Sequence, residues 1–185
     1  AERIFERIAL SELPQGLGAL IHLPKRTIAD IAPTNDALIV ALEEPQDRGN
    51  VGAIVRTVDA AGGQALILIG QAVDPFDPEA LRTSMGATFT VPIVNASPEE
   101  FLAWSRKHQI HLLGTSARAE IEFRAAAYPR PLALIFGNER VGLSEHLKNE
   151  VDIMAKIPIL GRANSLNLGA SVAVMAYQAQ GVWTA

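Results

Sequence analysis

The chain has 185 residues but no cysteine, few aromatic residues and no long hydrophobic run. Without cysteine it can form neither a disulfide framework nor a thiolate metal site, which fits a reducing cytoplasm. No apolar run approaches the roughly 20 residues that a membrane span needs. The charged, amphipathic start AERIFERIALSE is not typical of a signal peptide. We therefore expect a cytoplasmic protein without a membrane segment.

Positive charge is also not in excess, because the formal net charge is −4. This balance argues against a protein that coats nucleic acid by bulk electrostatic attraction, although 16 Lys and Arg leave room for a local basic patch. Aromatic residues make up 5% of the chain and apolar residues 49%, so the core should be aliphatic. The length allows one good core, or one core with a small appendage.

The common motifs of nucleotide-binding and hydrolytic sites are missing. The chain has no G-x-x-x-x-G-K-[ST], no G-x-G-x-x-G after a strand, no H-E-x-x-H and no G-x-S-x-G. His108 and His111 are three positions apart, but they span an expected helix-to-strand junction. We interpret them as a solvated pair and expect no bound metal.

From residue 37 onward, short apolar runs alternate with helix-like stretches. The expected strands are Ala37–Leu42, Ala65–Ile69, Thr90–Val94, Ile110–Leu113, Leu132–Phe136 and Ile153–Ile159, and the expected helices are 50–61, 78–84, 98–107, 144–149 and 167–180. This alternation predicts an α/β fold with a mostly parallel sheet and helices on both faces. Ligands bind at the carboxyl ends of such strands, so the loops after Leu42, Phe136 and Ile159 are the most informative. Before this pattern, we expect a helix over residues 1–12 and a linker over residues 13–36.

The first candidate segment, Glu43 to Thr57, takes the chain from a strand through a polar turn into a helix. We expect the helix to begin near Gly49 or Asn50, with Asn50 as its N-cap. Arg56 falls opposite the apolar stripe of this helix. A capped helix with a solvated arginine is the simpler interpretation, but Arg56 lies close to the carboxyl end of a strand.

The second candidate segment, Phe136 to Leu143, follows a fully apolar strand. Gly137 allows a ligand to approach the backbone, and Glu139 needs a partner if it is partly desolvated. An ordinary strand exit, with Ser144 capping the next helix, explains the segment about equally well.

The third candidate segment is IPILGRANSLNLGAS, residues Ile157 to Ser171. Ser165 or Asn167 can cap the helix that follows, yet one cap needs only one polar side chain and Asn164 is present as well. The helix itself is small or apolar all round, so we expect it to be buried against another element, which could belong to a second subunit.

Together the three segments resemble the motifs of the SpoU family of RNA ribose 2′-O-methyltransferases, within the SPOUT superfamily. The matching residues are Asn50-x-Gly52-x-x-x-Arg56-Thr57, then Phe136-Gly137-Asn138-Glu139-x-x-Gly142-Leu143, then Ile157-Pro158-Ile159-x-Gly161-x-x-x-Ser165-Leu166-Asn167. Three motifs in this order within one α/β pattern are specific, and the match covers about residues 37–182. One departure is Gly169, which follows Leu168 where the family more often has valine then serine or alanine; it costs roughly 1 kcal/mol in a helix.

The resemblance implies a fold, a cofactor, partners and site residues. The fold would include a C-terminal trefoil knot, S-adenosylmethionine would be the methyl donor, and a homodimer formed through the knot region would act on rRNA or tRNA. The donor-binding residues would be Thr115, Gly137, Ile157, Ser165, Leu166 and Asn167, and the catalytic residues would be Asn50, Arg56, Glu139, Ser165 and Asn167. Residues 37–185 would be the catalytic domain, and residues 1–36 the remnant of a truncated N-terminal RNA-binding domain.

Two other functions stay open. A non-catalytic RNA-binding module on the same fold predicts erosion of the polar motif residues, but all of them are present. Another chemistry of the superfamily, such as base methylation of tRNA, fits less well with Asn50-x-Gly52-x-x-x-Arg56.

Overall fold

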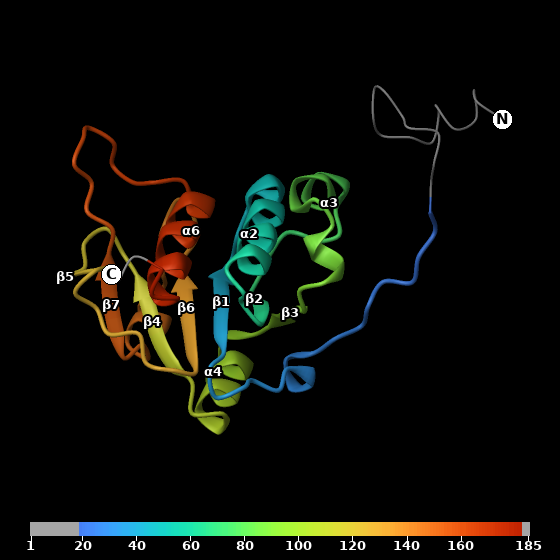
Figure 1. The fold of residues 1–185 in the computed structure, drawn as a ribbon, viewed down its shortest axis with the longest axis horizontal. Coiled ribbons are helices and arrows are strands. Elements are labelled where there is room, and N and C mark those ends of the chain that lie inside the picture. The colour runs from blue at the N-terminus through green and yellow to red at the C-terminus, as the bar shows by residue number, and fades with distance from the viewer. Residues whose placement is uncertain (1–18, 183–185) are drawn as a thin grey trace.

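The computed structural model describes residues 19–182, so the helix expected over residues 1–12 lies outside the described part of the chain. Residues 19–27 contain no helix or strand. A short 3-10 helix, η1 (Ile28–Asp30), then precedes the sheet. Figure 1 shows this segment running along the outside of the domain before it joins β1.

A seven-stranded sheet forms the centre of the domain, in the order β3-β2-β1-β6-β4-β7-β5, and every neighbouring pair is parallel. The strands are β1 (Leu38–Glu43), β2 (Ala65–Ile69), β3 (Ile93–Ala96), β4 (His111–Thr115), β5 (Ile121–Glu122), β6 (Leu132–Phe136) and β7 (Ile153–Lys156). The helices are α2 (Arg48–Ala60), α3 (Pro78–Ser84), η2 (Ala87–Phe89), α4 (Pro98–Lys107), α5 (Glu145–Lys148) and α6 (Leu168–Ala179). No helix within residues 19–182 is long and apolar enough to cross a membrane.

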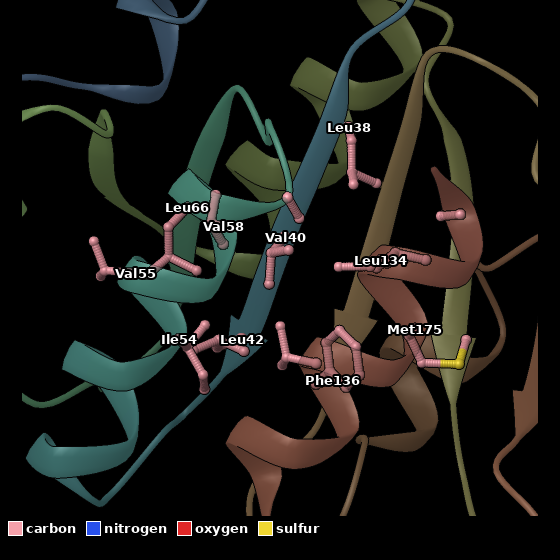
Figure 2. Packing of buried hydrophobic residues seen from close by; sticks show 14 of the residues in the cluster. Leu38, Val40, Leu42, Ile54, Val55, Val58, Leu66, Leu134, Phe136 and Met175 are labelled. Atoms are coloured by element: carbon pink, nitrogen blue, oxygen red, sulfur yellow. The ribbon is translucent and has the colours of Figure 1, made fainter. Parts of the chain in front are cut away.

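Strand β1, which lies next to the centre of the sheet, is buried on both sides, which explains its nearly unbroken apolar sequence. It pairs with β2 on one edge and β6 on the other, so that Val40 lies level with Leu66 and Leu134. Alternate residues of the strands then face opposite layers. Leu38, Val40 and Leu42 pack with residues of α2 and α6, as Figure 2 shows. The remaining core residues of β1 pack with α4 and α5, so the predicted two-sided arrangement is confirmed.

Gly52 allows α2 and α3 to approach closely. A Cβ atom at this position would lie 2.0 Å from Thr83 Oγ1 and 2.2 Å from the carbonyl oxygen of Ala80. Such distances are far below van der Waals contact, so any larger residue would force the two helices apart. The first motif therefore contains a glycine for a packing reason as well as any functional one.

Several predicted boundaries differ from the structure. The strand expected at Thr90–Val94 is β3 at Ile93–Ala96, because η2 continues into a turn in which Thr90 Oγ1 donates to the carbonyl of Ala87. The strand expected to reach Ile159 ends at Lys156, two residues before Pro158, which cannot donate to a sheet. The two-residue strand β5 was not expected, because so short a segment has no detectable period.

The last helix, which we expected to be buried, is buried on only one side within the single chain. Val172, Met175 and Ala176 of α6 are fully buried against the sheet and α2. Ala170 is exposed, and Val174 and Tyr177 are only partly buried. One side of an almost entirely apolar helix therefore reaches the surface of the domain.

Candidate functional site

A cavity of about 940 Å³ lies where β1, β4, β6 and β7 end. Its walls come from the segments that follow these four strands, namely residues 46–50, 115–118, 136–143 and 157–168. In parallel sheets this edge is the usual place for a ligand, and the volume is typical of small-molecule sites. In Figure 1 it is the edge to which the arrowheads point, beside the long connection from β7 to α6.

Asn50 joins the three candidate segments in the wall of this cavity. Its Nδ2 donates to Glu139 Oε1 at 3.5 Å, and its Oδ1 accepts from Asn167 Nδ2 at 2.9 Å. The backbone N–H of Gln46 donates to the other oxygen of Glu139 at 3.3 Å. Residues 89 and 117 positions away in the sequence therefore meet at one amide group.

The side chain of Asn50 is available for these contacts because it does not cap its helix. The predicted N-cap role of Asn50 is wrong: α2 begins at Arg48, and Asp47 is the cap. The Asp47 carboxylate accepts from the backbone N–H of Asn50 at 2.6 Å, which satisfies an otherwise unpaired donor of the first turn.

Asn167 caps the last helix, one of the two caps that were expected, and also makes a hydrogen bond to the first segment. As the N-cap of α6, it accepts from the backbone N–H of Ala170 through Oδ1 at 3.3 Å. Its Nδ2 remains free to donate to Asn50. Ser165 lines the same cavity but does not cap the helix.

Residues 137–144, hereafter the Gly137–Ser144 loop, fold back tightly on themselves. The backbone N–H of Gly142 donates to the carbonyl of Asn138 at 2.8 Å. A Cβ atom on Gly137 would lie 2.0 Å from the nitrogen of Leu143 and 2.1 Å from the carbonyl carbon of Gly142. Only glycine fits there, so Gly137 is needed for the shape of the loop itself.

The end of β1 holds the Gly137–Ser144 loop at both of its ends. The Asn138 amide donates to the carbonyl of Glu44 at 2.8 Å, and its oxygen accepts from the N–H groups of Arg140 and Val141 at 2.9 and 3.3 Å. At the far end, the buried carboxylate of Glu43 accepts from the backbone N–H of Ser144 at 2.7 Å. Ser144 caps α5, as the sequence predicted.

The predicted donor-binding residues all line the cavity; they are Thr115, Gly137, Ile157, Ser165, Leu166 and Asn167. Thr115 is fixed by a hydrogen bond from Oγ1 to the carbonyl of Ile135 at 3.2 Å. Leu166 is 40% exposed and so presents apolar surface at the cavity. Their common location is observed, whereas their individual roles stay predictions.

Arg56 is the one predicted catalytic residue that does not line the cavity. It is exposed on α2, six positions after Asn50 and so about 9 Å further along the helix axis. Four positions separate it from Gly52, so it lies on the side of α2 that faces α3. Its side chain has no hydrogen-bond or ion-pair partner within residues 19–182.

Some residues of the cavity were not among the sequence candidates. Gln46 contributes through its backbone, and Arg118 lies in a loop without a motif, so neither gave a signal. Asn138 and Arg140 stood inside the second motif, but nothing in their spacing distinguished them from turn residues. Glu43 does not line the cavity but holds the Gly137–Ser144 loop; it was not named as a site residue because it ends an apolar strand, where the residue is only 8% exposed.

The histidine pair lies away from the cavity. His108 contacts Trp104 with the rings tilted by 49° and their centroids 5.4 Å apart, and His111 Nδ1 is 3.9 Å from a carboxylate oxygen of Asp152. Residues 19–182 contain no group of three or more His, Cys, Asp or Glu side chains that could hold a metal ion.

The chain has a fully parallel sheet, and a polar cavity lies at the carboxyl ends of its strands. These features place it in the class of α/β domains that bind ligands at the carboxyl ends of the strands. Comparison with known proteins identifies the family. The SpoU rRNA methylase family model matches residues 37–177, and the chain belongs to that family. The matched range, which ends at Tyr177, contains all three motif segments.

Two curated relatives are similar over most of the chain. A 23S rRNA (uridine(2479)-2′-O)-methyltransferase of Streptomyces viridochromogenes is 32% identical over 91% of this chain and 61% of the relative. The 23S rRNA (guanosine(2553)-2′-O)-methyltransferase RlmP of Bacillus subtilis is 28% identical over 98% of this chain and 71% of the relative. The chain thus spans about three fifths of the length of the first.

Solved structures agree with the fold. An AdoMet-bound rRNA methyltransferase from Sinorhizobium meliloti has a TM-score of 0.83 and 37% identity, and the match covers 86% of this chain and 62% of that one. The SpoU methyltransferase AviRb from Streptomyces viridochromogenes, in complex with AdoMet, has a TM-score of 0.81 and 32% identity over 85% of this chain and 65% of that one.

Proposed function

We propose that this chain transfers a methyl group from S-adenosylmethionine to a ribose 2′-OH of rRNA. The observation that carries the proposal is the chain of hydrogen bonds from Asn167 through Asn50 to Glu139, which joins all three motifs in the wall of one cavity. The relatives named as 23S rRNA 2′-O-methyltransferases support ribosomal RNA as the substrate class.

The cavity fits the donor in size and in the character of its walls. Leu166 and Ile157 offer apolar surface for an adenine, and backbone groups near Gly137 and Thr115 can bind polar atoms of the donor. Ser165 and Asn167 add polar side chains at the same wall. S-adenosylmethionine supplies a methyl group on a positively charged sulfur, which makes that carbon electrophilic.

Methyl transfer breaks the sulfur–carbon bond, forms a bond between that carbon and O2′, and releases the hydroxyl proton. A hydroxyl is a weak nucleophile at neutral pH, so holding it in line with the breaking bond is the largest gain available. We propose that Asn50 and Glu139 orient the hydroxyl. Arginine stays protonated at neutral pH and is a poor general base, so we assign Arg56 to gripping the target phosphate and stabilising the developing alkoxide.

A homodimer would bring Arg56 to a cavity. In one protomer Arg56 lies outside the cavity, and one side of the apolar helix α6 is exposed. Leu160, in the connection from β7 to α6, is 96% exposed. We propose that a second copy covers these surfaces and that Arg56 acts at the cavity of the partner.

Substitution of Arg56 tests the proposal. Arg56→Ala should abolish methylation of unmodified rRNA while leaving the affinity for S-adenosylmethionine, measured calorimetrically, within about twofold, because Arg56 lies outside the donor cavity. Near-normal turnover of this variant would contradict the assigned role.

Two further measurements separate the alternatives. Absence of donor binding by the unmodified chain would favour a non-catalytic RNA-binding module. Mass spectrometry that maps the methyl group to a base would favour another chemistry of the superfamily.

Mixing Arg56→Ala with Asn167→Ala protomers should restore part of the activity if the two residues act across a dimer.

The remaining expectations are proposals as well. We propose that residues 37–185 form the catalytic domain, that residues 1–36 belong to an N-terminal RNA-binding part, and that the protein acts in the cytoplasm. We also propose that the C-terminal part is threaded as a trefoil knot; the long connection over residues 157–167 supports this, since it passes beside the strand exits before α6.

A further inference from the structure

The charged side chains that line the cavity differ in whether they have partners. The lining includes Asp47, Glu139, Lys148, Arg118 and Arg140. Asp47 caps α2, the Glu139 carboxylate accepts two hydrogen bonds, and Lys148 pairs with Glu145 at 2.6 Å. Each of these three charges is already engaged within the protein.

Arg118 and Arg140 are different. Their guanidinium groups have no hydrogen-bond or ion-pair partner among residues 19–182, and both side chains are exposed. Their backbones are nevertheless fixed: the N–H of Arg118 donates to Ser116 Oγ at 3.2 Å, and that of Arg140 to Asn138 Oδ1 at 2.9 Å. These two arginines are therefore the charged side chains of the cavity lining that have no partner among residues 19–182, in a chain whose net charge is −4.

The two arginines also come from neighbouring parts of the sheet. Arg118 follows β4 and Arg140 follows β6, and these strands are hydrogen-bonded neighbours. The guanidinium group is a planar fork that matches a phosphate with two parallel hydrogen bonds. Free arginines on adjacent loops beside one cavity favour an anionic ligand with repeated phosphates.

We propose that Arg118 and Arg140 bind backbone phosphates of the RNA strand that places its ribose in the cavity. This inference rests on the proposed function and adds the residues that recognise the acceptor strand. The sulfonium of the donor is also a cation, so two unpaired guanidinium groups nearby repel it. Once phosphates neutralise the arginines, this repulsion between the arginines and the donor falls.

This repulsion predicts that the RNA and the donor each strengthen the binding of the other. RNA binding should strengthen donor binding, and by thermodynamic reciprocity the donor should strengthen RNA binding by the same factor. If the arginines instead held the carboxylate of the donor, removing them would weaken donor binding in the absence of RNA.

The experiment compares Arg118→Gln, Arg140→Gln and the double variant with the unmodified full chain. The probe is a fluorescein-labelled oligouridylate of about 20 nucleotides, longer than the usual single-stranded site, titrated by anisotropy between about 50 and 200 mM KCl. Each single variant should bind about threefold to tenfold more weakly at the lowest salt. A plot of log K against log salt has a negative slope. Its magnitude should fall by about 0.7 for each phosphate that the variant no longer neutralises.

Lys107→Gln is the matched control, because it removes the same charge from the exposed end of α4. This residue lies near the amino end of β4, whereas the cavity lies at the carboxyl ends of the strands. Its affinity and salt slope should equal those of the unmodified chain. An unchanged slope in the double variant, or an equal change in the control, would overturn the proposal.

Calorimetric titration with S-adenosylmethionine alone separates the two levels of inference. The double variant should bind the donor as tightly as the unmodified chain, or more tightly. Weaker donor binding would assign the arginines to the donor carboxylate and would also overturn the proposal. If the unmodified chain fails to bind the donor, the proposed function fails, while the salt slopes still decide whether the arginines bind phosphate.

Discussion

The connections that follow β6 and β7 both line the cavity, yet the protein holds them in opposite ways. The Gly137–Ser144 loop is fastened to the end of β1 by Asn138 and Glu43 and is closed by a hydrogen bond of its own. In the connection over residues 157–167, Asn167 alone makes a hydrogen bond within the described chain. We infer that the first loop is shaped by this chain alone, and that the second takes its final shape from what binds there.

The largest expected effect comes from breaking the hydrogen-bonded link that joins the two connections through Asn50. Asn167→Ala deletes the partner of Asn50 and should lower kcat/KM for methylation by about a hundredfold or more. Removal of the helix cap should cost only about 1 kcal/mol in the free energy of unfolding. Steady-state kinetics and urea denaturation measure the two quantities.

The exposed Asn95 of β3 offers a control for this prediction. Asn95→Ala should change neither quantity appreciably. If Asn167→Ala lost activity only in proportion to its loss of folded protein, Asn167 would be a helix cap and nothing more.

The same substitution made in each connection compares them directly. Gly137→Ala places a methyl group 2.0 Å from the nitrogen of Leu143, so it should destabilise the protein by about 1–3 kcal/mol and weaken donor binding. Gly161→Ala meets no atom within 4 Å, and should change stability by less than about 0.5 kcal/mol. Denaturant titration measures the stability of both variants, and calorimetry measures their donor binding. Similar effects at the two glycines would contradict the inferred difference between the two connections.

A smaller effect is expected from Asn138. Asn138→Ala leaves the N–H groups of Arg140 and Val141 without their acceptor and should cost about 1–2 kcal/mol. Asn138→Asp keeps that acceptor but loses the donor to the carbonyl of Glu44. Hydrogen exchange at Arg140 and Val141 should therefore accelerate in the alanine variant and much less in the aspartate variant. Equal acceleration in both would show that the bond to Glu44, not the acceptor, holds the loop.

The smallest effect concerns another fastened connection, between β5 and β6. The phenol of Tyr128 donates to the carbonyl of Phe123 at 2.5 Å, and partial burial raises the pKa of Tyr128 to about 12. The folded state thus keeps this proton to higher pH than the unfolded state, whose pKa is about 10. Stability from this group is complete below pH 10 and is lost as the pH rises towards 12.

Because Tyr128 is only half-buried, the loss should be limited to about 1 kcal/mol. Urea denaturation at a series of alkaline pH values measures it, with Tyr128→Phe as the reference. A free energy of unfolding that falls equally steeply in both proteins would assign the pH dependence to other groups.

Much of the fold could be predicted because its signals are local. The aliphatic runs identified the strands of the parallel sheet except β5, and the caps and prolines at the starts of α3 and α4 fixed those helices at 78–84 and 98–107 as expected. The fully buried β1 and β6 gave the strongest signals. Boundaries failed where a side chain or a turn competed with the pattern, as at Asp47 and at Thr90.

By itself, the sequence determined the alternation of strands and helices and the three motif segments, because each depends on residues close together in the chain. Tertiary structure decided which atoms of those segments meet. Asp47 caps α2 and frees Asn50, and the pairing of β1 with β6 brings Glu139 to it across 89 positions. The same structure leaves Arg56 outside the cavity of the single chain. Neither result could be predicted from spacing, because a contact between distant segments depends on strand order and helix orientation, which no local pattern encodes.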